Sequence, residues 1–438
     1  MMKANMIRNN LDQTISFIEK HKQRFVKNPD KDFTRQRKLS VSDVLRFVIT
    51  IEGASLKKEV YRYSNASNVN FTTSAYIQQR NKLLPSAFKT ALHKFNELCS
   101  DEKTFMGYHV YAADGSYINI CEDPADTDSY IKVSNDVRGH NLLELHALYD
   151  LSNHTYKDAI VLPVHKSNER VALQSMLKNN KFEEKSIIIT DRGYEGYNMF
   201  AHLVNTPNVD FVCRVNQKSP IKPIKHLPMC ELDEDISFEI TTTQTNDDKI
   251  NNRILLRQSS KKGNSPKTRI SKWDFSSPYR FSLRVVRVMI AENEYETLIT
   301  SLPRNIFSLE TIKQLYHMRW GIETSFRTLK YTVGLTHLHS KKEEFICQEI
   351  YAKLIMYNFF ERISAFAVVK HKKNKKHIYQ INYVMAVAIC REYYREKKSF
   401  SLITEQLQRH IEPIRPGRTG RRRLITKSFV PFVYRVSA

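Results

Sequence analysis

The spacing of apolar residues changes along the chain. Up to about residue 100, apolar side chains recur every three or four positions, which is the period of an amphipathic helix. From about residue 104 they form short alternating or continuous runs bounded by turn-forming residues, which is typical of strands. Helical spacing returns in the last third of the chain. The pattern predicts an α/β protein with helical regions at both ends.

The order of the predicted strands narrows the fold. Strand-like segments at 105–120, 142–151 and 156–164 precede a helical stretch at 168–180 and a buried strand at 186–190. Three strands, a helix and a fourth strand are the order in which a ribonuclease H-like fold begins. The predicted division is a helical N-terminal region (1–103), the first part of a ribonuclease H-like core (104–208), a β-rich insertion (209–301), the second part of the core (302–368) and a basic helical C-terminal region (369–438).

One predicted helix, at residues 316–330, carries an unusual polar face. At about 100° per residue one side is polar and the adjacent side is apolar. The polar side holds Tyr316, Arg319, Glu323, Arg327 and Lys330. One carboxylate among several cations suits a metal ion held beside phosphate. The alternative is an ordinary solvated helix with pairs between the glutamate and its basic neighbours.

Two aspartates make the metal interpretation more specific. Asp114 lies in the middle of a predicted strand, where a charge is costly without a partner, and Asp191 follows a buried strand directly. Ligand sites gather at strand ends, although taken alone Asp191 can be a turn residue and Asp114 can face solvent. Three converging carboxylates, Glu323 included, would repel one another unless a cation were bound. Mg²⁺ prefers oxygen ligands, and two such ions can activate the attacking oxygen and stabilise the leaving oxygen of a phosphodiester displacement.

Charge and composition indicate the class of partner. The chain of 438 residues has 69 Lys and Arg against 46 Asp and Glu, a net charge of +23. Such an excess points to a polyanion, most often nucleic acid, although some basic proteins have no such partner. The six cysteines form no C-x-x-C pair, which favours a reducing cytoplasm. No secretory signal and no apolar run of membrane-spanning length is recognised, so we expect no membrane partner.

The N-terminal region offers candidate DNA contacts. Two short predicted helices on either side of residues 68–72 resemble a helix-turn-helix, and a plain helical bundle is the alternative. In the first case Arg80 and Lys82 lie on or near the reading helix, and Arg35, Arg37 and Lys38 form a phosphate-contacting arm. Basic runs at 370–377 and 415–427 favour further phosphate contact over mere solubility.

The chain resembles the DDE transposases of bacterial insertion sequences, specifically the insertion-sequence-four family. That family carries a Tyr-x2-Arg-x3-Glu-x6-Lys signature, which YHMRWGIETSFRTLK matches at every position. The segments DGSYI around Asp114 and DRGY around Asp191 also resemble family blocks. The resemblance covers roughly residues 30 to 435.

The resemblance implies roles for individual residues. Asp114, Asp191 and Glu323 would be a catalytic triad that binds two Mg²⁺ ions, for which Mn²⁺ can substitute. The residues expected to contact DNA are Tyr316, Arg319, Arg327, Lys330 and Arg214. Some relatives stack a flipped base on a tryptophan in the strand before the glutamate helix, but the present strand has none. Tyr295 could supply that stacking face, and Trp320 is interpreted as a packing residue.

The resulting functional expectation is cut-and-paste DNA transposition. The protein would bind the inverted-repeat ends of its element as a homodimer in a synaptic complex. It would cleave double-stranded DNA there and join the 3′ ends to target DNA. Its expected location is the bacterial cytoplasm, at the nucleoid. The alternatives are a catalytically inactive or domesticated DNA-binding regulator and a ribonuclease H-like nuclease without strand transfer.

Overall fold

A computed structural model describes most of the chain. The described residues are 2–35, 37–99, 103–132, 139–217, 220–243, 245–256, 273–292, 294–367, 377–396 and 400–414. The basic runs at 370–377 and 415–427 therefore lie almost entirely outside the described residues.

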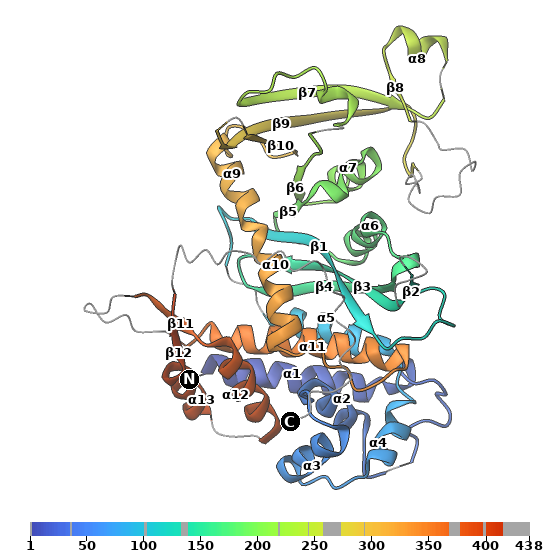
Figure 1. Ribbon diagram of the computed structural model, residues 1–438, viewed down its shortest axis with the longest axis vertical. Helices are drawn as coiled ribbons and strands as arrows, with labels where there is room; N and C mark the ends of the chain where they lie inside the picture. Colours follow the sequence, from blue (N-terminus) through green and yellow to red (C-terminus); the bar gives the residue numbers. More distant parts are fainter. Residues whose placement is uncertain are drawn as a thin grey trace.

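A ten-stranded mixed sheet forms the centre of the described structure (Figure 1). Its strands are β1 (His109–Ile120), β2 (Tyr130–Ile131), β3 (His140–Asp150), β4 (Thr155–Pro163), β5 (Ser186–Thr190), β6 (Val209–Arg214), β7 (Leu232–Thr241), β8 (Ile254–Leu255), β9 (Tyr279–Ala291) and β10 (Glu294–Thr300). Strand β3 is antiparallel to β1 and β4, whereas β5 is parallel to both β1 and β6. Strand β10 joins β6 to β9, and β9 pairs with β7.

The predicted strand order is confirmed. The long strands β1, β3 and β4, with the two-residue β2 between the first two, precede helix α6 (Glu169–Asn179), and β5 then returns parallel to β1. The strand-rich block at 209–301 is also present. Because β6 pairs with β5 and β10 pairs with β6, this block extends the same sheet across residue 209 instead of forming a separate sheet.

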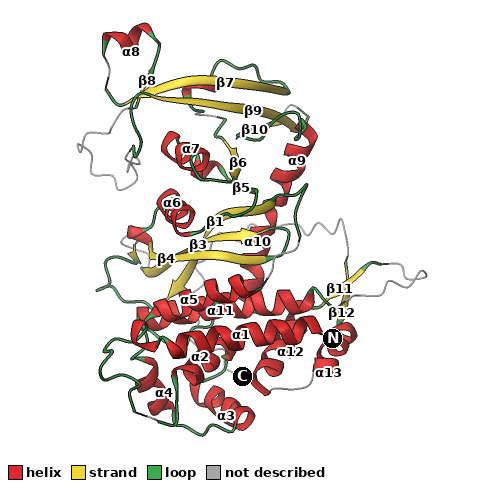
Figure 2. Ribbon diagram, turned by 180° about the vertical axis from the view of Figure 1, so that it is seen from behind, coloured by secondary structure: helices red, strands yellow, loops and turns green. Residues whose placement is uncertain are grey.

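Helices cover both faces of the sheet (Figure 2). One face packs against α5 (Pro85–Leu98), α10 (Trp320–Arg327) and α11 (Glu343–Ser364). The other packs against α6 and α7 (Tyr197–Val204). Alternate residues of β1 follow this division, since Val110 and Ala112 belong to the first core and Tyr111 and Ala113 to the second.

The N- and C-terminal helices form one layer around α11. This helix contacts α1 (Met2–Lys20), α2 (Val41–Thr50), α12 (Tyr383–Glu396) and α13 (Phe400–Arg409) as well as α5. Strands β11 (Tyr379–Ile381) and β12 (Ile411–Pro413) pair beside it. The regions predicted to flank the core at opposite ends of the sequence are therefore packed on a shared helix. Across the described residues, no helix has the length and apolar character needed to cross a membrane.

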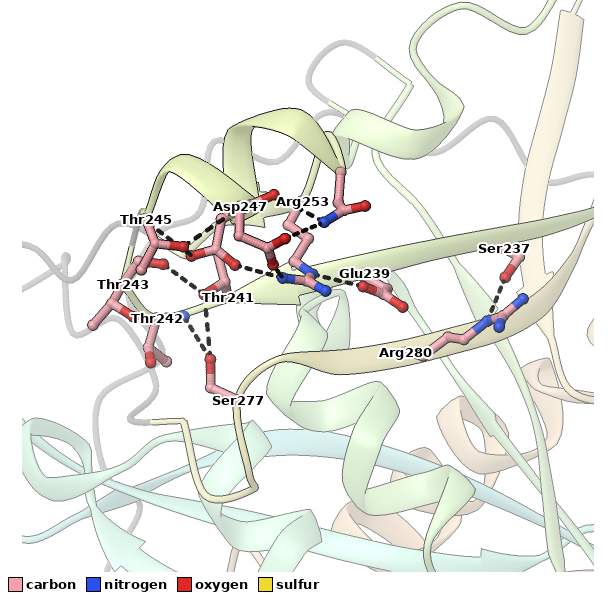
Figure 3. A network of polar contacts seen from close by, with 12 residues as sticks. Ser237, Glu239, Thr241, Thr242, Thr243, Thr245, Asp247, Arg253, Ser277 and Arg280 are labelled. Atoms are coloured by element: carbon pink, nitrogen blue, oxygen red, sulfur yellow. Dashed lines mark hydrogen bonds and ion pairs between the residues drawn. The ribbon is translucent and has the colours of Figure 1, made fainter.

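At the other end of the sheet, Arg253 holds a small helix on the β7–β9 ribbon (Figure 3). Its guanidinium donates to Glu239 at 2.7 Å, to Asp247 at 2.5 Å and to Asp248 at 3.0 Å. Asp248 also completes a capping box with Thr245 at the start of α8 (Asn246–Ile250). One arginine thus ties helix α8 to the edge of β7.

The two predicted N-terminal helices are present as α3 (Leu56–Ser67) and α4 (Thr73–Arg80), but the DNA-contacting role expected for Arg80 is wrong. Arg80 is 2% exposed, and its guanidinium donates to Gln348, to Glu349 at 3.0 Å and to the carbonyl of Phe345. Burial acts to raise the pKa of Glu349, but Arg80 and His339 outweigh it and lower that pKa to about 2. Arg80 therefore anchors α4 to α11 and cannot reach phosphate.

We expect Arg80→Ala to destabilise the protein by about 3–5 kcal/mol, because it leaves the carboxylate of Glu349 buried without its cation. The measurement is the midpoint of thermal unfolding, with the half-buried neighbour Lys82→Ala as a control that should change it little. A variant that unfolds at the wild-type temperature but binds DNA poorly would restore the original interpretation of Arg80.

Candidate active site

Asp114 lies on β1 and faces the helical layer that contains α10. Its side chain is 21% exposed, and its Oδ1 accepts a hydrogen bond of 2.8 Å from the backbone N–H of Gly115. The strand register pairs Asp114 with Ala147 of β3, within the core of this face. The charge expected to be costly in mid-strand is thus half-buried and partly compensated.

Asp191 lies beside Asp114 because β5 ends where it pairs with the middle of β1. Ala113 of β1 pairs with Thr190 of β5, and each is followed directly by one of the two aspartates. Asp191 caps the short helix η3 (Arg192–Tyr194), with its Oδ1 accepting from Gly193 N–H at 2.8 Å. It is therefore both the turn residue that its sequence context allows and a neighbour of Asp114.

Glu323 approaches from the helical layer. The helix predicted for 316–330 is present in three connected parts: α9 (Leu309–Met318), α10, and η5 (Thr328–Thr332), which has π-helical hydrogen bonding. Helix α10 packs on β1, and the Glu323 side chain is 40% exposed. The spacing of apolar residues therefore predicted that Glu323 lies on a helix. It did not predict the break at Arg319 or the π-helical hydrogen bonding of η5.

Arg319 links the helix to the sheet. Its Nη2 lies 2.8 Å from Oε1 of Glu323, and its Nη1 lies 3.7 Å from Oδ2 of Asp114. The whole residue is 7% exposed, with the guanidinium carbon 5.3 Å from the ring centre of Trp320. One buried cation thus bridges carboxylates that come from different elements.

The electrostatics of Asp114 indicate that the three carboxylates share one environment. Burial raises the pKa of Asp114 to about 6, against the effect of the Gly115 N–H. Asp191 and Glu323 raise this pKa further, whereas Arg319 lowers it. Each carboxylate is therefore close enough to Asp114 to disfavour its ionised form, a repulsion that a bound cation would relieve.

The donor set suits a hard divalent cation in kind. Three carboxylates offer the oxygen ligands that Mg²⁺ and Mn²⁺ prefer. In the described part of the chain, however, no three His, Cys, Asp or Glu side chains converge on a common metal position. Arg319 supplies the positive charge instead. The chemistry fits a metal, provided that these side chains turn toward one another.

Sequence reasoning missed two further carboxylates. Glu169, at the start of α6, and Glu144, on β3, each influence the pKa of neighbouring groups at this site. Burial raises the pKa of Glu169 to about 7, and the charges of Asp191 and Glu144 add to this effect. One sequence feature could have indicated that other side chains approach the two aspartates. A glycine, which leaves space beside it, follows Asp114 directly and follows Asp191 after one residue.

The residues expected to contact phosphate differ in accessibility. Tyr316 is 6% exposed, so it cannot contact phosphate directly from this position; its ring lies 5.8 Å from the Arg319 guanidinium carbon. Arg214 is 36% exposed and forms a 3.1 Å ion pair with Glu296. Its charge also acts on Tyr316, whose pKa burial raises to about 12.

Two exposed or half-buried cations lie further along the same helix. Arg327 is exposed at the end of α10, and Lys330 is half-buried in η5, where burial lowers its pKa.

Trp320 is 52% exposed, so its interpretation as a packing residue is wrong. Tyr295 is half-buried on β10, three residues before Leu298, which pairs with Arg214.

The proposed N-terminal phosphate contacts are partly brought together. Arg35, Arg37 and Lys82 line a cavity of about 220 Å³, to which Lys31 and Asp30 also contribute. Lys38 is exposed next to Arg37. Among the described residues, no ion pair engages Lys31, Arg35 or Arg37. Four cations around one carboxylate repel one another, so this cavity suits an anion.

A family model that covers more than half of the chain shows the family to which it belongs. A family model described as Transposase DDE domain matches residues 106–359. The chain is 36% identical over 90 residues to the InsL protein of insertion sequence element IS186A from Escherichia coli strain K12 and to the transposase for insertion sequence element IS421 from Escherichia coli. These matches cover 20% of this chain and only 24% of each relative. A solved piggyBac transposase synaptic complex with hairpin DNA shows 9% identity and a TM-score of 0.42, over 96% of this chain and 87% of that chain.

We expect Arg37→Ala to weaken binding to duplex DNA and to reduce the slope of log affinity against log salt by about one, because one cation of the anion-binding cavity is removed. Fluorescence anisotropy at several salt concentrations measures both. The exposed Lys181→Ala, on the α6 side, is the charge-matched control. An equal slope for both variants and the wild type would show that the cavity does not bind the DNA backbone.

Proposed function

The chain belongs to the transposase DDE domain family, and from this premise we propose that it is a DNA transposase of the insertion-sequence-four group. It would bind the inverted-repeat ends of its insertion sequence, cleave the DNA and join the 3′ ends to a target. The observation that carries the proposal is the strand register that sets Asp114 and Asp191 side by side, with α10 and Glu323 packed over them.

We further propose that the sheet is a ribonuclease H-like core. The strand order that supports this runs β4-β3-β1-β5-β6, with β3 antiparallel to its neighbours and β5 and β6 parallel to β1. The ends of the parallel strands are where an open sheet offers a ligand site. Asp191 directly follows one of these ends, and Asp114 lies on the adjoining part of β1.

Asp114, Asp191 and Glu323 would hold two Mg²⁺ ions, for which Mn²⁺ can substitute. When bound, the metal supplies Lewis-acid activation of the phosphodiester and of the attacking hydroxyl. The carboxylates would hold the cations beside β1 and the end of β5. Without metal, the guanidinium of Arg319 pairs with the carboxylates of Asp114 and Glu323. Once these carboxylates bind metal, the guanidinium can form two hydrogen bonds to a phosphate.

The surrounding side chains would orient the DNA. Lys330, Arg327 and Arg214 are the more accessible cations and would contact the phosphates of the element end. Tyr316 would not contact the DNA itself but would hold Arg319 in place through a cation–π contact between its ring and the guanidinium. Tyr295 is proposed as the stacking residue in place of the missing tryptophan.

Two element ends must be cut and joined together, so we propose that the active assembly is a homodimer in a synaptic complex. It would act on DNA at the nucleoid in the bacterial cytoplasm. The test of the function is excision from a donor plasmid that carries the flanking DNA of the gene. The wild type should excise the element, and Asp114→Asn and Asp191→Asn should not; binding without excision by the wild type would indicate a regulator.

We expect Glu323→Gln to lower the rate of cleavage at least about 100-fold, since it removes about 3 kcal/mol of metal-mediated transition-state stabilisation. Binding to the element end should change little, because no cation is lost. The control is Glu310→Gln, the same exchange at an exposed position in the first turn of α9. Normal cleavage by the Glu323 variant would refute the triad.

A further inference from the structure

Each aspartate of the proposed active site is followed by a glycine whose missing side chain leaves room for a glutamate. A Cβ on Gly193 would stand 2.3 Å from Oε1 of Glu169, and a Cβ on Gly115 would stand 3.0 Å from Oε1 of Glu144. Among the glycines that the structure describes, Gly107 and Gly334 have positive φ angles, whereas Gly115 and Gly193 do not. The lack of a side chain at these two positions therefore leaves space for the glutamates and does not serve a positive φ.

The space at Gly193 brings Glu169 next to Asp191. Oδ1 of Asp191 lies 3.0 Å from the same Cβ position, so both carboxylates lie against one small volume. The first turn of α6 fixes this arrangement. Asn168 caps the helix through the N–H groups of Arg170 and Val171, and Nε of Arg170 donates to the carbonyl of Gly193 at 2.8 Å.

Two fully buried polar groups beside these carboxylates point to a ligand. Tyr194 is 0% exposed, and its hydroxyl has no hydrogen-bond partner within the described part of the chain. The charges that act on it come from Glu169, Asp114, Asp191 and Glu144. The Tyr194 hydroxyl thus lies near a group of carboxylates, and no described protein atom forms a hydrogen bond with it.

The second group is His146, which is also 0% exposed and whose Nδ1 has no partner among the described residues. This atom lies 3.3 Å from the Cβ position of Gly115, near the carboxylate of Glu144. Its Nε2 is 2.5 Å from the hydroxyl of Ser167 and 3.8 Å from Glu144. Glu144 thus has a basic neighbour of its own.

Glu169 is the better candidate for the metal. In the register of β1 and β3, Glu144 pairs with Tyr117, three residues beyond Asp114. Glu169 instead shares its space with Asp191 directly. The cation that acts on Glu169 is Arg170, but Nε of Arg170 already donates a hydrogen bond to the carbonyl of Gly193. A cation held by Asp191 would therefore stabilise the ionised carboxylate of Glu169.

We propose that Glu169 is a fourth acidic residue of the metal site, which adds its carboxylate on the side of Asp191. The inference rests on the proposed function, because it assumes the metal that the triad would hold. The role of Gly193 follows from it: the Asp-Arg-Gly turn must lack a side chain so that the glutamate of α6 can reach the aspartate of β5.

The test is Mn²⁺ binding by the DNA-free protein, measured from the free-ion signal in electron paramagnetic resonance. We expect Glu169→Gln to weaken Mn²⁺ affinity at least about tenfold, the scale seen when groups that support a metal site are removed. Glu184→Gln is the matched control, since it removes an exposed carboxylate just before the other end of β5. Affinity within about twofold of wild type for both variants would overturn the proposal.

A second variant addresses the same contact without removing the carboxylate. Gly193→Ala should push the flexible end of Glu169 aside and weaken Mn²⁺ binding, but should add little to the effect of Glu169→Gln. Additive effects of the two changes would show that Gly193 acts otherwise and would contradict the proposal. If Glu169→Gln fails to fold, Gly193→Ala alone decides, and wild-type affinity then overturns it.

Asp191→Asn separates this inference from the proposed function. Loss of Mn²⁺ binding in Asp191→Asn together with wild-type binding in Glu169→Gln would leave the triad standing and remove Glu169. Weakened binding in Glu169→Gln with normal binding in Asp191→Asn would refute the triad and, with it, the role proposed for Glu169 beside Asp191. Failure of wild-type protein to bind Mn²⁺ would refute both.

Discussion

The contact of Arg319 with Asp114 and Glu323 is the interaction on which the site depends. The parallel pairing of β5 with β1 brings Asp114 and Asp191 into one neighbourhood, and α10 adds a third carboxylate. Burial makes this arrangement unfavourable, as the raised pKa of Asp114 indicates. A guanidinium between sheet and helix offsets the repulsion in the protein alone. In the proposed function a divalent cation would replace it and leave Arg319 free for phosphate.

Helix α11 supports this site from behind. It packs on β4, on α5 and on helices from both ends of the chain, so residues far apart in sequence depend on one buried element. The ion pair between Arg80 and Glu349 is part of this support, and it connects α4 to the helical layer on which η5, the continuation of α10, also rests. The N-terminal region is therefore attached firmly to the layer that carries Glu323.

The sequence predicted those features that depend on period and order. The alternation of apolar residues revealed β1, and helical spacing placed Glu323 on one face with Arg319. It could not predict which side of a short helix is buried, so Arg80 was assigned to DNA and Trp320 to the interior. Glu169 was missed because its proximity to Asp191 arises from tertiary packing, and the glycine that permits it resembles an ordinary turn residue.

The central claim is that Asp114, Asp191 and Glu323 together form one binding site for the two metal ions. Its most direct test is to load the protein with Fe²⁺ in place of Mg²⁺, add ascorbate and peroxide, and map where the polypeptide is cut by radicals formed at the ion. The account predicts cuts close to residues 114, 191 and 323, all suppressed by excess Mg²⁺. Cuts near one of these residues alone, or at a site remote from all three, would contradict it.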